Sequence, residues 1–359
     1  MFTHEEKDLL VQRYIKTPLL LDGKKFDLRL YVLVKGFDPM EAYLADEGLA
    51  RLCTEPYRQP TLANMKNMFM HLTNFSLNKN SENYKAPDEN FFDQNDGSKR
   101  LLTQLYRTLE EQGHDVAKIK ERIADTVKKS VVTMEPYLKH MYHTRVSQDH
   151  ESSKAFHILG MDILLDKKMN AWLMEVNANP SLNMFLEKDV PPDCGIEPEK
   201  ILSELDKYVK TKVIAESLRI VTGLGTSEYE GTFEQLLPCD EPDFDRYYIW
   251  NRGLELFELM VKQGKASEAV TLFQFSRLAR VPEFTRMNQF FKADLEICFK
   301  NMQRKHDCQA LSLDGFFDAV EYLSKKVYKD EEDFEECLTQ FLDAAIPFFE
   351  EQQTNTKIQ

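Results

Sequence analysis

Apolar and charged residues alternate strictly along residues 24–37, and this alternation predicts the first long element of the chain. A period of two is that of a β-strand with one buried and one solvated face. The predicted core face carries Phe26, Leu28, Leu30 and Val32, and the charged face carries Lys25, Asp27 and Arg29. Further strands are predicted at 9–15, 40–44 and 49–53, the last two joined by a turn at 46–48.

Apolar positions recur every three or four residues in other segments, which is the spacing of an amphipathic helix. This spacing predicts helices at 100–112 and 116–142, after a loop-rich segment at 76–99, and another helix near 197–221. After Asp240 the pattern is helical, over 246–263, 267–278, 284–304, 313–328 and 331–351. The expected fold class is α+β, an antiparallel sheet with flanking helices followed by an all-α region.

Two apolar runs, 160–165 and 171–176, flank a polar segment and are predicted to form a β-hairpin of buried strands. Glu175 and Asn177 lie two residues apart on one strand and therefore share a face, and Asp162 on the partner strand can face them. Carboxylate and amide oxygens are ligands that Mg²⁺ accepts. The alternative is that these polar residues only solvate the strand ends.

The 359-residue chain is 42% apolar and 11% aromatic, which is ample for a globular core. It has no apolar run of about 18 residues and its start is too polar for a signal peptide, so we expect a soluble, intracellular protein with no membrane partner. The six cysteines form no Cys-x-x-Cys pair, which argues against a zinc site or a disulfide framework and favours free thiols.

The net charge of −14 belongs mainly to the second part of the chain. Residues 1–220 hold 31 Lys and Arg against 34 Asp and Glu, a net charge of −3, whereas residues 221–359 hold 15 against 26, a net charge of −11. Nucleic acid is therefore not an expected partner, because binding to phosphates needs a concentrated basic face.

A Gly- and Thr-containing segment at 222–227 is a plausible linker, and it divides the chain into a first domain at 1–225 and an acidic helical domain at 226–359. Residues 307–318 lie between two predicted helices as an EF-hand loop would. The sixth-position Gly is missing and the twelfth residue is Asp318, so either a degenerate EF-hand-like pair or a plain helical bundle is expected, without calcium binding.

Six motifs, taken together, resemble the tubulin tyrosine ligase-like family, ATP-grasp ligases that attach amino acids to tubulin and other proteins. They occur in the order of the family: VQRYI at 11–15, DGKKFDLRLYVL at 22–33, EGLAR at 47–51, HLTNFSLNK at 71–79, GSKR at 97–100 and the hairpin at 160–181. The resemblance covers residues 9–190 and implies an ATP-grasp-like fold.

The resemblance assigns roles to individual residues. Positions that bind the nucleotide are matched by Gln12, Arg13, Tyr14, Ile15, Lys25, Asp27, Thr73 and Asn74, and positions that hold the incoming amino acid by Arg51, Ser76 and Lys99. Asp162, Glu175 and Asn177 match the magnesium ligands, and Lys25, Asp27 and Arg51 are the implied catalytic residues. From the residues alone, a solvated salt-bridge stripe remains the alternative for Lys25 and Asp27, and an ordinary solvated charge for Arg51 and Lys99.

The implied reaction uses ATP and Mg²⁺ and forms an acyl phosphate on a carboxylate of the acceptor protein, which the amino group of a free amino acid then attacks. Tubulin or microtubules are the implied acceptor and L-glutamate the implied amino acid. The expected location is cytoplasmic, at the cytoskeleton, a cilium or a basal body.

The chain departs from the family because only ten residues precede Val11, so the N-terminal jaw of the ATP-grasp clamp, with its lysine and Gly-containing phosphate loop, is not found. Three explanations stay open. The chain is a fragment of a longer active ligase, a non-catalytic member that binds tubulin or serves structurally in cilia, or one half of a split enzyme.

Overall fold

The computed structural model describes residues 12–37, 39–87, 90–92, 96–146, 155–187, 200–223, 232–238, 248–261, 269–286, 292–329 and 331–357. The chain divides into two compact units. The first consists of Met1–Gly36, Met40–Lys128 and Lys154–Pro238, and the second of Phe37–Pro39, Lys129–Ser153 and Cys239–Gln359. The sheet of the first unit extends past residue 225, because strand β10 (Phe233–Leu237) belongs to it.

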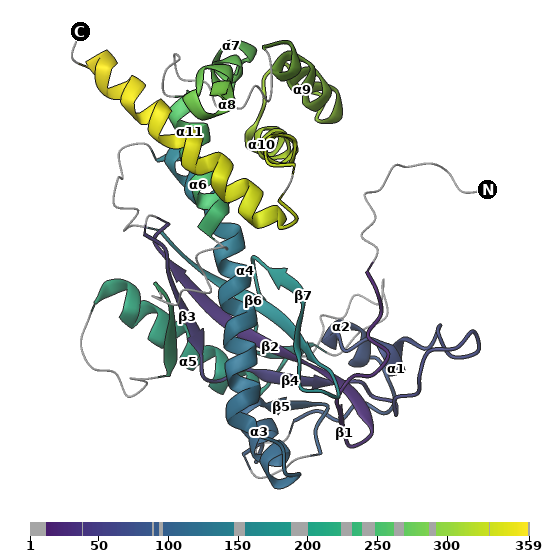
Figure 1. Cartoon of the computed structure of the whole chain (residues 1–359). Coiled ribbons are helices and arrows are strands. Elements are labelled where there is room, and N and C mark those ends of the chain that lie inside the picture. The colour runs from purple at the N-terminus through teal and green to yellow at the C-terminus, as the bar shows by residue number, and fades with distance from the viewer. Residues whose placement is uncertain are drawn as a thin grey trace, which may run out of the picture. The chain divides into compact units, whose positions relative to one another are not determined.

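Strand β2 (Lys24–Lys35) organises an eight-stranded antiparallel sheet in the first unit. Its first half pairs with β4 (Leu49–Leu52), its second half with β3 (Glu41–Ala45), and most of its length with β6 (Phe156–Leu165). Around these lie β1 (Leu20–Leu21) on β2, β5 (Lys99–Leu101) on β4, β7 (Ala171–Asn177) on β6, and β10 on β3. Figure 1 shows β2, β4 and β6 side by side. Helix α4 (Val116–Arg145) belongs to this unit up to Lys128 and to the second unit from Lys129 onwards.

The charged face of β2 is buried at Lys25 and Asp27, which excludes the solvated salt-bridge stripe as the alternative for these two residues. Lys25 and Asp27 are 6% and 5% exposed, whereas the predicted core residues of the other face are buried as expected. Lys25 is covered by His71 and Tyr14, and Asp27 by Arg51 and Thr73. Further along the same face, Tyr31 packs in one cluster with Leu205, Val209 and Val213 of helix α5 (Glu204–Thr222).

The hairpin of β6 and β7 is confirmed, but its second strand is not buried. Trp172, Leu173 and Met174 are 36–47% exposed, because no strand of the described chain pairs with the outer edge of β7. The turn is fixed by Asp166, whose carboxylate accepts hydrogen bonds from the backbone N–H groups of Lys168 and Asn170. The register shifts after Asp162, which leaves Met174 as an extra residue on β7.

The predicted strand at 9–15 is wrong for the residues that the structure describes. Residues 12–15 are in extended coil without strand pairing, and 9–11 lie outside the described residues. After these residues, an isolated β-bridge pairs Pro18 with Asp166. Short elements complete the unit: α1 (Met68–His71), α2 (Phe75–Asn78), α3 (Leu102–Glu111), and the two-stranded pair of β8 (Phe185–Glu187) and β9 (Lys200–Leu202).

The second unit is helical, as predicted. Its elements are the C-terminal part of α4, α6 (Ile249–Val261), α7 (Leu272–Phe275), a 3₁₀ turn (Ser276–Arg280), α8 (Pro282–Arg286), α9 (Lys292–Lys305), α10 (Leu313–Val327) and α11 (Phe334–Lys357). The helix predicted at 284–304 is represented by α8 and α9, and 287–291 lie outside the described residues. Buried aromatic rings fill the core, among them Phe257, Phe275, Phe299, Phe316 and Phe341.

The segment between α9 and α10 has one feature of an EF-hand pair, an isolated β-bridge between Leu311 and Val270. The carboxylate of Asp318, the twelfth residue of the loop, instead binds the side chains of Lys305 and His306 at 2.6 Å each. Two side-chain partners thus occupy the carboxylate that calcium would need as a ligand.

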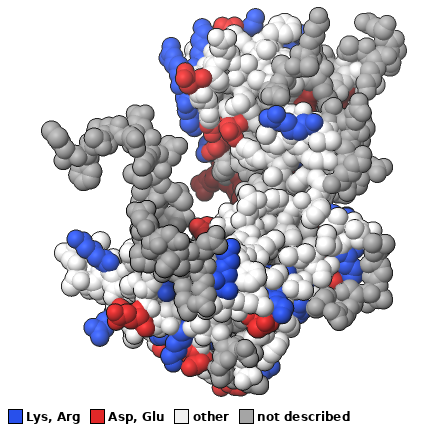
Figure 2. Space-filling view, turned by 180° about the vertical axis from the view of Figure 1, so that it is seen from behind, with Lys and Arg blue, Asp and Glu red and all other residues white. Residues whose placement is uncertain are grey.

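None of the helices in the described ranges is long and apolar enough to cross a membrane. Cys53, Cys298, Cys308 and Cys337 are free thiols, as predicted, and Cys194 and Cys239 lie outside the described residues. On the face shown in Figure 2, Lys and Arg side chains of the described residues are interspersed with Asp and Glu.

Candidate functional site

The register of the sheet places charged residues from five strands in two adjacent rows on one face. Directly opposite residues of antiparallel strands point to the same side, so each row is a set of neighbours. One row runs through Lys99 on β5, Arg51 on β4 and Asp27 on β2, and the other through Arg29 on β2, Asp162 on β6 and Glu175 on β7. Residues that lie up to about 150 positions apart in the sequence thus share one surface.

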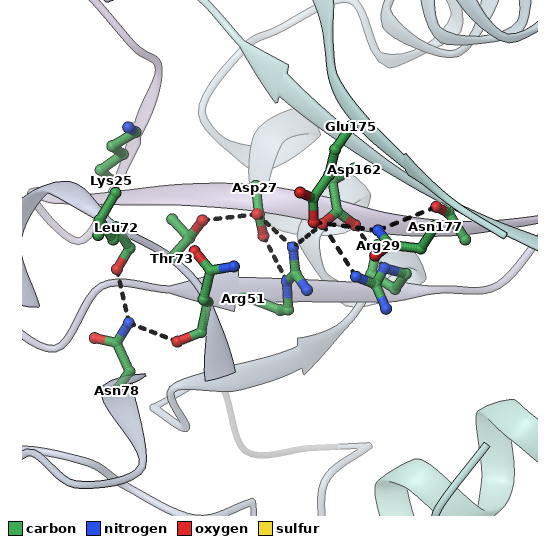
Figure 3. Close-up of polar contacts among 12 residues, drawn as sticks. Lys25, Asp27, Arg29, Arg51, Leu72, Thr73, Asn78, Asp162, Glu175 and Asn177 are labelled. Carbon is green, nitrogen blue, oxygen red and sulfur yellow. Dashed lines mark hydrogen bonds and ion pairs between the residues drawn. The ribbon is translucent and has the colours of Figure 1, made fainter. Parts of the chain in front are cut away.

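Two arginines and two aspartates connect these rows by ion pairs (Figure 3). Arg51 donates from Nε to Asp27 at 2.8 Å and from Nη2 to both Asp27 and Asp162, at 2.5 and 2.7 Å. Arg29 donates to the two oxygens of Asp162 at 2.5 and 3.0 Å. The hydroxyl of Thr73 donates to Asp27 at 2.7 Å. We call Asp27, Arg29, Arg51 and Asp162 the arginine–aspartate network.

Burial makes the charges of this network interdependent. Asp162 is 2% exposed and Arg51 is 8% exposed. Burial by itself raises the pKa of Asp162, but Arg29 and Arg51 hold it below its usual range. Burial likewise lowers the pKa of Arg51, and Asp27 and Asp162 more than reverse this effect. Both shifts favour the charged forms of Asp162 and Arg51, and removing one of these two leaves a buried charge with fewer partners.

Lys25 points away from the network (Figure 3). Its Nζ donates to the backbone carbonyl of His71 at 2.8 Å and lies 4.7 Å from the ring centre of Tyr14. Burial lowers the pKa of Lys25. His71 packs edge-on against the rings of Tyr14 and Tyr57, as expected of a residue with a packing role.

A cavity of about 940 Å³ gathers the first group of predicted nucleotide-binding residues. It is lined by Gln12, Arg13, Tyr14, Ile15, Lys16, Thr17, Lys25, Leu164, Asp166, Trp172, Leu173 and Met174. The exposed apolar side chains of β7 form one wall, and the cationic Lys25 lies at another. An apolar wall with a nearby ammonium suits a planar base linked to phosphates. Asp27 and Thr73, predicted with the same group, lie instead in or against the arginine–aspartate network.

The predicted magnesium ligands lie next to one another. Asp162 faces Glu175 across the strand pair, and the Asn177 side-chain amide donates to Glu175 at 3.2 Å. A carboxylate offers about four lone-pair sites. In Asp162, N–H groups of Arg29 and Arg51 occupy three of them, which leaves about one for another partner. One lone-pair site of Asp162, the carboxylate of Glu175 and the amide oxygen of Asn177 form an oxygen donor set that fits Mg²⁺.

A second cavity, of about 390 Å³, gathers the predicted amino-acid-binding residues. Arg51, Ser76 and Lys99 line it together with Arg29, Tyr31, Leu49, Asn74, Phe75, Glu175, Asn177, Asn179, Pro180, Ser181, Asn183, Phe185, Leu186, Asp206 and Lys210. Asn74, predicted to contact ATP, lies on this side. The ammonium of Lys99 lies 4.2 Å from the ring centre of Phe75 and is 2.8 Å from the carboxylate of Asp206.

Three residues of the site were not among the sequence predictions. Arg29 had a signal, because it continues the charged face of β2 after Lys25 and Asp27. Asp206 and Lys210 had none, since an acidic and a basic residue four positions apart on a helix are usually a surface pair. Only the packing of α5 against the sheet brings them to the cavity.

Comparison with known proteins agrees with this arrangement. The family model described as "Tubulin-tyrosine ligase family" matches residues 2–191, which include the arginine–aspartate network and the hairpin. Tubulin polyglutamylase TTLL11 of Homo sapiens is 41% identical over 222 residues, which are 62% of this chain and 30% of that relative. Tubulin polyglutamylase TTLL7 of Homo sapiens is 43% identical over 265 residues, 72% of this chain and 29% of that relative.

A third relative extends the similarity to the helical region. The probable beta-tubulin polyglutamylase of Tetrahymena thermophila is 31% identical over 344 residues, which are 96% of this chain and 23% of that relative. The matched segments thus span less than a third of each of these relatives. The family model covers more than half of this chain, and the strands it includes carry the site. The chain belongs to the tubulin-tyrosine ligase family.

Proposed function

We propose that this chain is part of an ATP-dependent ligase that adds glutamate to carboxylates in the tails of tubulin. The observation that supports it most is that the charged rows of the sheet bring a magnesium donor set and the smaller cationic cavity together, and that the larger, nucleotide-sized cavity lies beside Lys25 of β2 in the same unit. The relatives are named tubulin polyglutamylases, which supports the choice of acceptor and amino acid.

The residues divide the work of binding between the two cavities. Segment 12–17, Lys25 and the exposed side chains of β7 would hold the nucleotide, with the ammonium of Lys25 offsetting phosphate charge. Asp162, Glu175 and Asn177 would hold Mg²⁺, which neutralises phosphate charge and orients the terminal phosphate when it is bound. Arg29 holds the carboxylate of Asp162 ionised and in place, and Asp27 does the same for the guanidinium group of Arg51.

The amino acid would lie in the smaller cavity. The guanidinium groups of Arg29 and Arg51 are anchored by Asp27 and Asp162, so they are oriented before any ligand arrives. The Nε and Nη2 groups of Arg51 are used by Asp27 and Asp162, so Arg51 would offer its Nη1 group to a ligand carboxylate, and Arg29 would offer Nη1 and the second proton of Nη2. Ser76 and Lys99 provide further donors on the same wall.

In the proposed reaction, a carboxylate of the acceptor attacks the terminal phosphorus of ATP, the bond to the bridging oxygen breaks, and ADP leaves. The amino group of glutamate then attacks the resulting acyl phosphate, and inorganic phosphate leaves as the amide forms. Neither step needs a nucleophile from the protein. The residues of the chain act by positioning the reactants and by balancing their charge.

The proposal is tested by incubating the chain with tubulin, labelled L-glutamate, ATP and Mg²⁺, and by locating added glutamate by mass spectrometry. Glu175→Gln should lower incorporation by about 10–100-fold, because it removes a metal carboxylate. Glu234→Gln changes an exposed carboxylate on β10 and should leave the rate unchanged.

No incorporation by the unmodified chain, together with sedimentation of the chain with microtubules, would replace the ligase by the non-catalytic tubulin-binding alternative. The proposed acceptor implies a location at the cytoskeleton. A cilium or basal body stays a prediction, which localisation of the tagged chain in ciliated cells would test.

A further inference from the structure

The side-chain amide of Asn78 is buried and uses all of its hydrogen-bonding groups. Asn78 is the last residue of α2 and is 1% exposed. Its Nδ2 donates to the backbone carbonyls of Leu72, at 2.7 Å, and Asn74, at 3.1 Å (Figure 3). Its Oδ1 accepts from the backbone N–H of Thr54 at 3.0 Å and from the Thr54 hydroxyl at 3.1 Å. Two donors and two acceptor sites are the full capacity of an amide, so Asn78 ties the segment that follows β4 to both ends of segment 72–74.

The chain from His71 to Ser76 reaches groups that line both cavities. The carbonyl of His71 accepts from Lys25, and Nδ1 of its ring lies 3.2 Å from the hydroxyl of Tyr14. Lys25 and Tyr14 line the larger cavity, whereas residues 74–76 line the smaller one. A displacement of this short stretch would therefore be felt on the nucleotide side and on the amino-acid side at once.

Segment 72–74 has little else to fix its conformation. It belongs to no helix or strand, and the side chain of Leu72 is 40% exposed, so packing holds it weakly. The Leu72 carbonyl has a second partner in the Cys53 thiol at 3.4 Å, but a thiol is a weak donor. The hydroxyl of Thr73 donates to Asp27 and so depends on the path of the same backbone. The amide of Asn78 is thus the strongest tie on the two carbonyls that bracket Thr73.

On the basis of the function proposed above, we propose that Asn78 is a positioning residue that holds segment 72–74 between the two cavities. It keeps Thr73 against Asp27 of the arginine–aspartate network and Asn74 at the wall of the smaller cavity. Asn78 is not among the described residues that line either cavity, so it acts through this segment. Because the reaction joins groups held in different cavities, loss of alignment lowers the rate constant more than it weakens the binding of either reactant.

The first test is Asn78→Asp in the full chain. The variant keeps the shape of the side chain and accepts the two bonds from Thr54, but it loses both N–H donors and places an oxygen against two carbonyl oxygens. We expect kcat for glutamate incorporation into tubulin to fall about 10–100-fold, while KM for ATP and KM for L-glutamate change by about threefold or less. The matched control is Asn80→Asp, the same change at an exposed neighbour, which should alter none of these quantities.

The second test is Thr54→Val, which removes one of the two donors to Oδ1 of Asn78 and leaves the segment 72–74 itself unchanged. We expect a smaller fall in kcat, about two- to fivefold, again with little change in KM. The double variant should be no slower than Asn78→Asp alone, because Thr54 acts through Asn78. Thr61→Val, at an exposed position, is the control. Additive losses in the double variant would contradict this route.

The unfolding temperature of each variant separates positioning from general stability. Rates are compared at a temperature at which every variant is folded. An unchanged kcat with a lowered unfolding temperature would show that Asn78 is only structural, and a raised KM with an unchanged kcat would show that the segment serves binding alone. Either result overturns the inference. If Asn78→Asp does not fold, the kcat of Thr54→Val decides in the same way.

The outcomes also distinguish this inference from the proposed function. If the unmodified chain incorporates no glutamate, the proposed function fails and this inference fails with it. If the unmodified chain is active and Asn78→Asp keeps its kcat, only this inference fails.

Discussion

The two compact units stabilise their interiors by different means. Among the described side chains, the buried charged residues lie in the first unit, and three of them, Asp27, Arg51 and Asp162, belong to the arginine–aspartate network. The core of the second unit is aromatic and aliphatic, with Phe284 stacked on Phe341 at 4.7 Å and Phe257 edge-on to Phe316 at 5.3 Å. Its ion pairs, such as Arg252 with Asp343, lie at the surface.

This difference indicates where function has shaped the fold. A buried ion pair adds little to stability compared with apolar packing, so a sheet that buries Asp27, Arg51 and Asp162 is not optimised for stability alone. Apolar packing is the more efficient solution, and the second unit uses it. In the proposed function the charges of the first unit serve binding, and the smaller cavity lies beside them.

Each unit contains one of the two tryptophans, so the comparison can be measured. Trp172 is on β7 of the first unit, and Trp250 is on α6 of the second, where it packs on Phe317. A Trp250→Phe background reports unfolding of the first unit by fluorescence, and a Trp172→Phe background reports unfolding of the second. The predictions below use these two probes.

The largest effect is expected from Asp162→Ala, which leaves Arg29 without its carboxylate and Arg51 with one partner fewer. We expect the free energy of unfolding of the first unit to fall by about 3–5 kcal/mol, because a buried charge loses its partner. Urea unfolding followed by Trp172 measures it. Phe316→Ala should cost about as much in the second unit, through the cavity it creates. A loss below about 1 kcal/mol for Asp162→Ala would show that the network is solvated.

A smaller effect is expected when the charge is kept and only the geometry changes. Arg51→Lys retains the positive charge but loses the fork that binds Asp27 and Asp162 together, so we expect a loss of about 1.5–3 kcal/mol. Leu323→Met, an equally conservative change in the second unit, should cost less than about 1.5 kcal/mol. Equal costs for the two variants would contradict the difference between the units.

Acid should weaken the first unit less than these substitutions do, because protonation removes a charge but leaves the atoms in place. The pKa values of Asp162 and Asp206 are lowered in the folded state, so their contribution to stability is complete above the ordinary carboxyl pKa of about 3.9. It is lost as the pH falls through the lowered values. Between pH 7 and pH 3, the urea midpoint that Trp172 reports should therefore fall more than the midpoint that Trp250 reports.

Asp162→Asn is the control for this acid effect, since it removes one of the carboxylates whose pKa is lowered and should reduce the shift of the Trp172 midpoint. The comparison carboxylate in the second unit is Asp318, whose pKa is lowered by Lys305 and His306 despite the raising effect of burial. Its side chain is 29% exposed, so solvent screens it. An equal or larger shift for Trp250 would contradict the prediction.

The smallest effect is expected at exposed ion pairs, whichever unit they belong to. Lys85 and Asp96 form a pair at 3.2 Å with side chains 62% and 69% exposed. Asp96→Ala should change the free energy of unfolding by no more than about 0.5 kcal/mol. The same small change is expected for Glu321→Ala, which removes the exposed pair with Lys325. A clear destabilisation by either variant would mean that surface charges also contribute to the difference between the units.

Local patterns were sufficient to predict many elements and site residues. The alternation at 24–37 gave β2, and the polar segment between two apolar runs gave the hairpin of β6 and β7. The prediction that Glu175 and Asn177 share a face with Asp162 agrees with the register. These inferences succeeded because a period of two and a turn signal depend on residues that are close together in the sequence.

The sequence by itself determined which residues carry charge, which segments form strands and helices, and that the chain resembles an amino-acid ligase. Only the tertiary structure decided that the charged face of β2 is buried, that Arg29 and Arg51 share Asp162, and that Asp206 and Lys210 reach the cavity. Burial and strand register depend on partners from β4, β6 and α5, which are far away along the chain. Alternation along one strand gives no information about what packs against it.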